Sequence, residues 1–541
     1  MSERIVKRAA LLVLVVVVAS SCAEKPVVPP PAGTPRLVVL ISVDQMRGEF
    51  IDRFDQFWTG GFRYLLDHSL QFTDAHQDHA ITATAPGHAS LATGCHPSRH
   101  GIYSNYWIDR ESGELVYSGA DDDWVASPFR LECDSLGDWL KARYRTARVF
   151  SVSGKDRSAV LMGGQHPDGV FFYDDDDGSW QSSEFYYRQG EPEWVDAFNA
   201  ERRLDARFGQ PWTVLPVSEE ELAAVGVEPF ELGPLEPDLP ISFGGLSPAP
   251  GASFYDDLFA SPWLDEHMVR FAEQLIGAEA LGGDEFPDLL ALGFSATDAV
   301  GHAYGPDSPQ LLDTLRRLDV TLGELFDFLD RRVGLENVVI ALTADHGSVS
   351  VPELRQAKGL SGRRMGDEDV LCMQRVYQRL QGRFGEGAWL LPGPFVNREA
   401  LADGDIDYQQ VERVAAELIA GCASVEAVWT RSELTTEAAA SDAMGRLFVN
   451  SFHPERAPDF MILRHEFFLT TRAVGTSHGT AWRYDTHVPL MIAADAISSG
   501  QRDQRVRTVD LAPTLAALLG VEPTTEIDGI NLGVDLELLS P

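Results

Sequence analysis

Short apolar runs recur along the chain, and each one leads into polar or charged residues. The four clearest runs are Leu37 to Val43, Ala147 to Val152, Leu289 to Phe294 and Val338 to Leu342. Continuous aliphatic runs of this length are typical of strands that are buried on both faces of a parallel sheet. We therefore predict a central strand at each of these four places.

Amphipathic stretches between the runs predict helices. One opens at Ser308-Pro309, a capping residue followed by proline in the first helical position, and continues towards Val333. Another follows Asp510 and is stopped by Gly520. Alternating strands and helices predict a doubly wound α/β sheet. Ligands of such sheets gather at the carboxyl ends of the strands.

Two long stretches interrupt this alternation. Residues near 165–285 are rich in tryptophan, tyrosine, proline and acidic residues, and residues near 350–475 have a mixed composition. We interpret both as insertions that form a cap within one catalytic domain, residues 36–541, although a length of 541 residues alone would allow roughly three or four domains.

The N-terminus predicts export. A basic segment, the apolar run Ala9 to Val18 and a few small residues precede Cys22, which is typical of a cleaved signal peptide over residues 1–21. A short membrane anchor is the alternative, but the run is shorter than the ~20 residues that usually span a bilayer. We expect a periplasmic or otherwise extracytoplasmic protein.

Cys22 also resembles the lipidated cysteine of a bacterial lipoprotein, although Ala19 stands where that motif usually has leucine. The proline-rich residues 22–35 are interpreted as an extended tether between a membrane surface and the enzyme. Membrane attachment through Cys22 is therefore one expectation for this chain.

The net charge argues against nucleic acid as a partner, and the cysteine content allows disulfide bonds. The formal net charge is -38, so the chain has no general basic field that would attract nucleic acid. The four cysteines other than Cys22 allow three disulfide pairings in an oxidising compartment, and the sequence does not choose among them. These four are Cys95, Cys133, Cys372 and Cys422.

Carboxylates and imidazoles follow the predicted strands or lie in small-residue turns. The six candidate metal ligands are Asp44, Asp298, His302, Asp345, His346 and His478. The i, i+4 spacing of Asp298 and His302 places both side chains on one face of a helical turn. Mixed oxygen and nitrogen ligands suit zinc or another divalent first-row metal.

Several segments together resemble the alkaline phosphatase superfamily, most closely the monomeric, phosphate-irrepressible bacterial alkaline phosphatases. The carrying segments, in order, are Val43-Asp44-Gln45-Met46-Arg47, Thr84-Ala85-Pro86-Gly87-His88-Ala89-Ser90, Ser104-Asn105-Tyr106-Trp107, Gly154-Lys155-Asp156-Arg157, Thr297-Asp298 with Gly301-His302, Ala344-Asp345-His346-Gly347 and Thr476-Ser477-His478. They cover nearly the whole chain after residue 36. The resemblance implies an alkaline-phosphatase-like three-layer α/β/α sandwich with a mostly parallel sheet, and a monomer.

The resemblance also assigns roles to the metal ligands and to Thr84. It implies two Zn²⁺ ions, one held by Asp298, His302 and His478 and the other by Asp44, Asp345 and His346 beside Thr84. Thr84 would be the nucleophile, because zinc lowers the pKa of a bound hydroxyl, and a phosphothreonine intermediate would follow. Without the ligand pattern, Thr84 would be read as an ordinary helix cap.

Three further residues bear on the substrate. In the phosphate-irrepressible group, residues that match Asn105, Lys155 and Arg157 contact the phosphoryl oxygens, and the related nucleotide phosphodiesterases lack the Lys-Arg pair. We therefore predict an alkaline phosphatase that hydrolyses small phosphate monoesters. A phosphodiesterase or nucleotide pyrophosphatase is the alternative, and a non-catalytic phosphate- or zinc-binding surface protein is a more distant one.

A sulfatase-like signature is misleading in this chain. Cys95-His96-Pro97-Ser98-Arg99 matches the motif whose cysteine becomes formylglycine, but Thr93-Gly94 precedes Cys95 here instead of following it. The position that matches the sulfatase nucleophile is Thr84. Because threonine cannot become formylglycine, we do not expect a sulfatase.

Overall fold

The computed structural model describes residues 29–121, 125–227, 241–243, 247–471 and 475–533. The predicted signal peptide, Cys22 and much of the predicted tether lie outside the described residues, so the leader, the lipidation and the tether stay predictions. Within the described ranges, no helix is long and apolar enough to cross a membrane.

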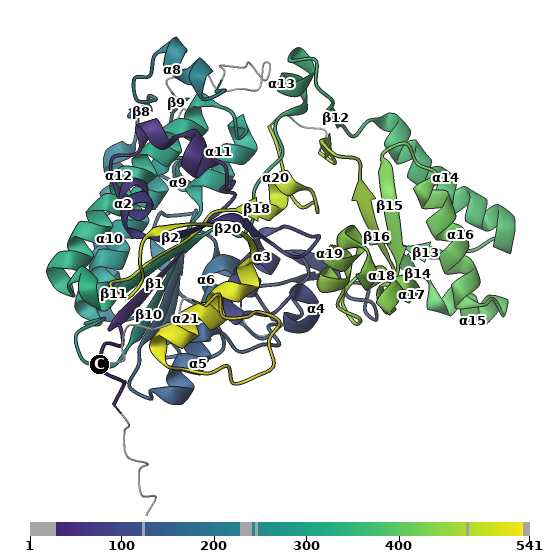
Figure 1. Ribbon diagram of the computed structural model, residues 1–541. Coiled ribbons are helices and arrows are strands. Elements are labelled where there is room, and N and C mark those ends of the chain that lie inside the picture. The colour runs from purple at the N-terminus through teal and green to yellow at the C-terminus, as the bar shows by residue number, and fades with distance from the viewer. Residues whose placement is uncertain (1–28, 122–124, 228–240, 244–246, 472–474, 534–541) are drawn as a thin grey trace, which may run out of the picture.

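A ten-stranded sheet forms the centre of the molecule (Figure 1), in the order β18-β2-β19-β11-β1-β10-β5-β6-β7 with β20 beside β2. The strands are β1 (Leu37–Val43), β2 (Leu70–His76), β5 (Val149–Ser153), β6 (Gly169–Tyr173), β7 (Trp180–Gln181), β10 (Asp288–Phe294), β11 (Val338–Thr343), β18 (His487–Val488), β19 (Leu490–Ala493) and β20 (Gly500–Arg507). The run from β11 through β1, β10 and β5 to β6 is parallel throughout. The four predicted central strands are therefore confirmed.

Helices cover both faces of the sheet, which makes the three layers that were expected. Alternate residues of β1 face opposite layers: Val39 and Ile41 join one hydrophobic cluster, and Val38 and Leu40 join another. The first cluster contains residues of α2 (Gly61–His68), α10 (Pro262–Ala278) and α12 (Pro309–Arg332). The second contains residues of α3 (Thr84–Thr93), α5 (Leu136–Arg143), α6 (Asp156–Gly163) and α21 (Leu511–Leu519).

The predicted helix boundaries have visible causes. The Ser308 hydroxyl accepts a hydrogen bond from the Leu311 backbone N–H at 3.2 Å, and Pro309 opens α12. Gly520 ends α21 in the left-handed conformation, with φ 63°.

The stretch near 165–285 contributes to the core layers. Strands β6 and β7 extend the central sheet, and α10 packs against α12. Its aromatic and acidic composition concealed a fully buried strand, β6, whose five residues all lie inside. The domain boundaries as such stay a prediction.

Residues 352–469 form a lobe to one side of the sheet (Figure 1), built mainly on α14 (Asp367–Phe384), α16 (Tyr408–Ala420), β15 (Val425–Thr430) and β16 (Phe460–Arg464). The lobe has a hydrophobic cluster of its own. One disulfide, Cys372–Cys422, lies within it, and a second joins Cys95 to Cys133 in the sheet-bearing part. The structure thus shows one of the three possible pairings, and in it Cys95 is part of a disulfide bond.

Candidate active site

Four adjacent parallel strands end at one edge of the sheet and bring the predicted site residues together. Asp44 follows β1, and Lys155 follows β5 after one residue. Asp345 follows β11 after one residue, and Asp298 lies in α11 (Ala296–Tyr304), directly beyond β10. Because the carboxyl ends of parallel strands share an edge, residues about 300 positions apart in sequence become neighbours.

Asp44, Asp345 and His346 form a buried group at this edge. The His346 Nε2 atom lies 3.5 Å from Asp44 Oδ1 and 3.2 Å from Asp345 Oδ2. All three of these atoms are buried and have no hydrogen-bond partner. Buried charged oxygens without partners are costly, and a divalent cation among them would satisfy all three atoms. The donor set therefore fits the zinc ion that was expected here.

Asp298, His302 and His478 form a second group beside the first. The i, i+4 pair on α11 places His302 Nε2 3.2 Å from Asp298 Oδ1, and His478 Nε2 lies 3.7 Å from the same oxygen. The rings of His346 and His478 stack with centroids 3.6 Å apart. Asp298, His346 and His478 also satisfy the spacing of a three-ligand set, so His346 lies within reach of either position. The assignment of ligands to each ion stays a prediction.

The three histidines share one mode of support. His302 Nδ1 lies 2.9 Å from the Thr476 carbonyl, His478 Nδ1 lies 2.8 Å from the Thr82 carbonyl, and His346 Nδ1 lies 3.0 Å from the Gly347 carbonyl. A carbonyl accepts only from N–H, so the proton is on Nδ1 and each Nε2 presents its lone pair towards the carboxylates. This is the arrangement that orients histidine ligands of metal ions.

Lys155 lies between the two groups. Its Nζ donates to Asp44 Oδ2 at 2.5 Å and to Asp298 Oδ2 at 2.6 Å. Burial alone would lower the pKa of Lys155, but the Asp298 and Asp44 carboxylates outweigh it and raise the pKa. Burial, followed by the charge of Asp44, raises the pKa of Asp345 well above its ordinary value. The site therefore holds more carboxylate charge than its own cations balance, which again fits added cations.

Thr84 is the first residue of α3 and is 1% exposed. Its Oγ1 lies 3.5 Å from Lys155 Nζ and 3.5 Å from Arg157 Nη2. Gly87 lets α3 approach the loop that carries Asp345 and His346, since a Cβ at residue 87 would lie 2.3 Å from the Asp345 carbonyl oxygen. Helix α3 thus packs directly on backbone that carries Asp345, and this contact sets the place of Thr84.

Asn105 borders the first turn of α3. Its Oδ1 accepts a hydrogen bond from the Ala85 backbone N–H at 2.7 Å, so its amide group is fixed next to Thr84. Lys155 and Arg157 place two cationic donors at the threonine hydroxyl, and Asn105 is fixed at the first turn of the same helix. Such donors suit an anion with several oxygens.

Two residues that were not predicted from the sequence also contact the site. Gln45, in the left-handed conformation with φ 68°, donates from its backbone to Asp345 Oδ1 at 3.1 Å and from Nε2 to Asp298 Oδ1 at 2.5 Å. It therefore links the two carboxylate groups. Its place directly after Asp44 was the available signal.

Tyr117, in β4 (Leu115–Tyr117), is the second such residue. Its hydroxyl donates to Asp156 Oδ1 at 2.5 Å, and the same oxygen accepts from the Arg157 backbone N–H at 2.7 Å. Burial alone would lower the pKa of Arg157, but Tyr117 and Asp156 outweigh it and raise the pKa. Nothing in the sequence around Tyr117 indicated this contact.

Comparison with known proteins agrees with this architecture. The family described as type I phosphodiesterase / nucleotide pyrophosphatase matches residues 38–488. The alkaline phosphatase PhoV of Synechococcus elongatus is 30% identical over 508 residues, which cover 90% of either chain. The alkaline phosphatase PhoK of a Sphingomonas species is 31% identical over 534 residues, covering 92% of this chain and 91% of PhoK.

A solved structure shows the same fold. The crystal structure of the alkaline phosphatase PafA superposes with a TM-score of 0.84 at 27% identity and covers 93% of this chain and 99% of that one. The predicted fold class is thereby confirmed. The chain belongs to the type I phosphodiesterase / nucleotide pyrophosphatase family of the alkaline phosphatase superfamily, among relatives that are named alkaline phosphatases.

Proposed function

We propose that the protein is an extracytoplasmic alkaline phosphatase that hydrolyses small phosphate monoesters, with Thr84 as its nucleophile and two Zn²⁺ ions as cofactors. The observation that carries this proposal is the approach of Lys155 Nζ and Arg157 Nη2, each to 3.5 Å from Thr84 Oγ1. Two fixed cations beside the nucleophile match the extra negative charge of a monoester.

The metal ions would be bound by Asp44, Asp345 and His346 on one side and by Asp298, His302 and His478 on the other. When bound, they supply the Lewis acidity that favours the threonine alkoxide and stabilises charge on the leaving oxygen. Because Lys155 contacts a carboxylate of each group, metal binding would free its ammonium group for the substrate.

Thr84 reacts with the phosphoryl group, and the other side chains bind its oxygens. Thr84 Oγ1 gives up its proton and forms a bond to phosphorus while the bond to the ester oxygen breaks. The leaving oxygen takes up a proton, so this step releases the alcohol and leaves phosphothreonine. Water then attacks the same phosphorus, the bond to Thr84 Oγ1 breaks, phosphate is released and the threonine oxygen regains a proton. Lys155, Arg157 and Asn105 hold the non-bridging oxygens in both steps, because the phosphoryl group stays at the same place.

The location of the enzyme is part of the proposal. The disulfides Cys95–Cys133 and Cys372–Cys422 support an oxidising compartment such as the periplasm. A signal peptide over residues 1–21, a tether over residues 22–35, lipid on Cys22 and a monomeric state complete it.

A phosphodiesterase is the second candidate, because the matching family carries the description type I phosphodiesterase / nucleotide pyrophosphatase. Hydrolysis of an aryl phosphate monoester and of an aryl phosphate diester by the zinc-loaded protein separates the two. We expect the monoester to be preferred, and we expect Lys155→Ala with Arg157→Ala to remove most monoesterase activity while the diesterase activity falls little. A clear preference for the diester would overturn the monoesterase proposal.

A further inference from the structure

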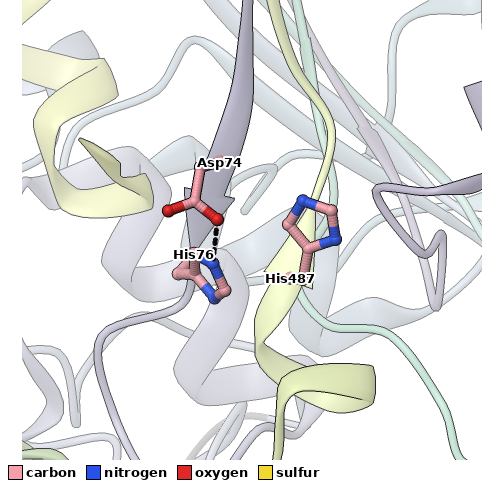
Figure 2. A group of neighbouring side chains, drawn as sticks. All are labelled: Asp74, His76 and His487. Atoms are coloured by element: carbon pink, nitrogen blue, oxygen red, sulfur yellow. Dashed lines mark hydrogen bonds and ion pairs between the residues drawn. The ribbon is translucent and has the colours of Figure 1, made fainter. Parts of the chain in front are cut away.

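A second cluster of potential metal ligands lies on the antiparallel side of the sheet, apart from the residues already assigned. Asp74 and His76 are two apart on β2, so their side chains share one face of the strand. His487, on β18, is the direct cross-strand partner of His76. The register alone therefore brings one carboxylate and two imidazoles together (Figure 2).

The donor atoms of this Asp74–His76–His487 cluster are close enough for one small cation. One ligand atom from each residue lies within 4.8 Å of the others. Zinc ligands at about 2.1 Å from the ion are separated by roughly 3.4 Å, so side-chain adjustments of about an ångström would complete the set. Imidazole with carboxylate is a combination that selects a divalent first-row metal.

Hydrogen bonds to neighbouring oxygens hold the two imidazoles in place. His76 Nδ1 lies 3.1 Å from the Thr486 hydroxyl, and His487 Nε2 lies 3.0 Å from the Thr73 carbonyl oxygen. When an ion takes the place of the proton between His487 Nε2 and the Thr73 carbonyl, the ring proton moves to Nδ1 and the carbonyl oxygen becomes a further ligand. The cluster thus offers three side chains and one backbone oxygen.

The guanidinium group of Arg483 places a positive charge between Asp74 and His76. Its Nη1 lies 2.9 Å from Asp74 Oδ1 and 3.0 Å from His76 Nε2. Arginine only donates hydrogen bonds, so this contact requires a lone pair on His76 Nε2, which is the form that binds metal. The same nitrogen lies 3.0 Å from Asp74 Oδ1, a contact that is a hydrogen bond when Nε2 carries the proton and a pair of neighbouring acceptors when it does not. In the second form the two acceptors need a cation beside them, and Nη1 of Arg483 is within hydrogen-bond distance of both. The Arg483 side chain is 61% exposed, so it can move into water and leave the place to an ion.

The cluster also touches the backbone that carries the active-site ligands. The Gly48 N–H donates to the His487 carbonyl at 3.0 Å, four residues after Asp44. The Gly347 N–H donates to the Asp485 carbonyl at 2.8 Å, directly after His346. An ion that joins β2 to β18 would therefore stabilise the segment against which both ligand loops are hydrogen-bonded.

We propose that Asp74, His76 and His487 form a third, structural binding site for a divalent transition metal, in competition with the guanidinium group of Arg483. This site is separate from the two ions of the proposed active site. Its occupancy does not depend on whether Thr84 reacts.

Equilibrium dialysis of the full chain against Zn²⁺ alone, with metal analysis, tests this. We expect wild type to bind one more ion per chain than His487→Gln or Asp74→Asn. The matched control is His465→Gln, an exposed histidine whose Nδ1 contacts Glu426, and it should bind as many ions as wild type. The test compares the number of ions bound by wild type and by each variant, so its result does not depend on how many ions the active site binds.

A second variant removes the competitor and keeps every ligand. Arg483→Met should lower the Zn²⁺ concentration that half-saturates the third site by roughly fivefold, since a partly exposed ion pair no longer has to be broken. Retained phosphatase activity would show that each variant is folded. Equal ion counts in wild type and His487→Gln, or an unchanged half-saturation in Arg483→Met, would overturn the proposal.

Discussion

The ammonium nitrogen of Lys155 lies 2.5 Å from Oδ2 of Asp44, and it reaches Asp298 in the other ligand group equally closely. One side chain thus links the carboxylates of both groups, and its positive charge balances part of theirs.

Lys155→Met should lower the free energy of unfolding of the metal-free protein by about 3–5 kcal/mol, because it leaves buried carboxylates without their cation. Zinc should restore most of this loss. Denaturant unfolding with and without zinc measures both values. Lys141→Met, which removes an exposed ion pair to Asp168, is the control. An equal loss in both forms would contradict this role of Lys155.

Tyr117→Phe should lower kcat/KM for a phosphate monoester by about tenfold. Asp156 would lose the hydroxyl that donates to it, and the Arg157 guanidinium would lose its hydrogen bond with Tyr117. The same change made in Arg157→Ala should have little further effect. Tyr106→Phe is the control, because Tyr106 is half exposed and its ring packs against that of Tyr117. Additive effects of Tyr117→Phe and Arg157→Ala would show that Tyr117 acts independently of the arginine.

Gly87→Ala should displace α3 from the Asp345 backbone, since the new Cβ would lie 2.3 Å from a carbonyl oxygen. We expect a loss of about 1–3 kcal/mol of stability and a larger relative loss of activity, because Thr84 moves with the helix. Thermal unfolding and monoester turnover measure the two effects.

Gly382→Ala is the matched control for that substitution. Gly382 also lies inside a helix, α14, but a Cβ there would meet nothing within 4 Å. This change should be neutral or stabilise the protein by up to ~1 kcal/mol. Similar behaviour of the two alanine variants would contradict the packing argument for Gly87.

The buried carboxyl group of Asp265 should make the free energy of unfolding depend on pH. It is 2% exposed, its Oδ2 has no partner, and burial raises its pKa to about 7. The folded state keeps this proton up to about pH 7, whereas the unfolded state releases it near pH 4, so stability falls as pH rises through that window. The loss is on the order of 4 kcal/mol.

Asp265→Asn should remove this decline, so the variant gains stability relative to wild type between pH 4 and pH 7. Chemical denaturation across that range measures the gain. Asp196→Asn, at an exposed position, should follow wild type. A constant difference between Asp265→Asn and wild type at all pH values would contradict the assignment.

The fold and the centre of the site could be predicted because their signals are local. The apolar runs before Asp44 and before Ala344-Asp345 are continuous and lead into candidate site residues, and the shared edge of parallel strands makes these residues meet. The i, i+4 spacing of Asp298 and His302 is likewise a property of one helical turn.

What could not be predicted depends on contacts between distant segments. The pairing of Cys95 with Cys133 is set by how α3 packs, and the contact of Tyr117 with Asp156 is set by where a hairpin lies against α6. Strand β6 was hidden by the aromatic and acidic residues that surround it. The disulfide and the Tyr117 contact have no periodic or motif signal, whereas β6 does carry a short apolar run, Val170 to Tyr173.

The central claim is that Thr84 carries the phosphoryl group during turnover. Rapid acid quenching of the zinc-loaded enzyme during hydrolysis of an aryl phosphate monoester, followed by peptide mass spectrometry, tests it most directly. We predict one phosphoryl group on the peptide that contains Thr84 in wild type and none in Thr84→Ala, which should also lose turnover. A phosphoryl group on another residue, or unchanged turnover in Thr84→Ala, would contradict the account.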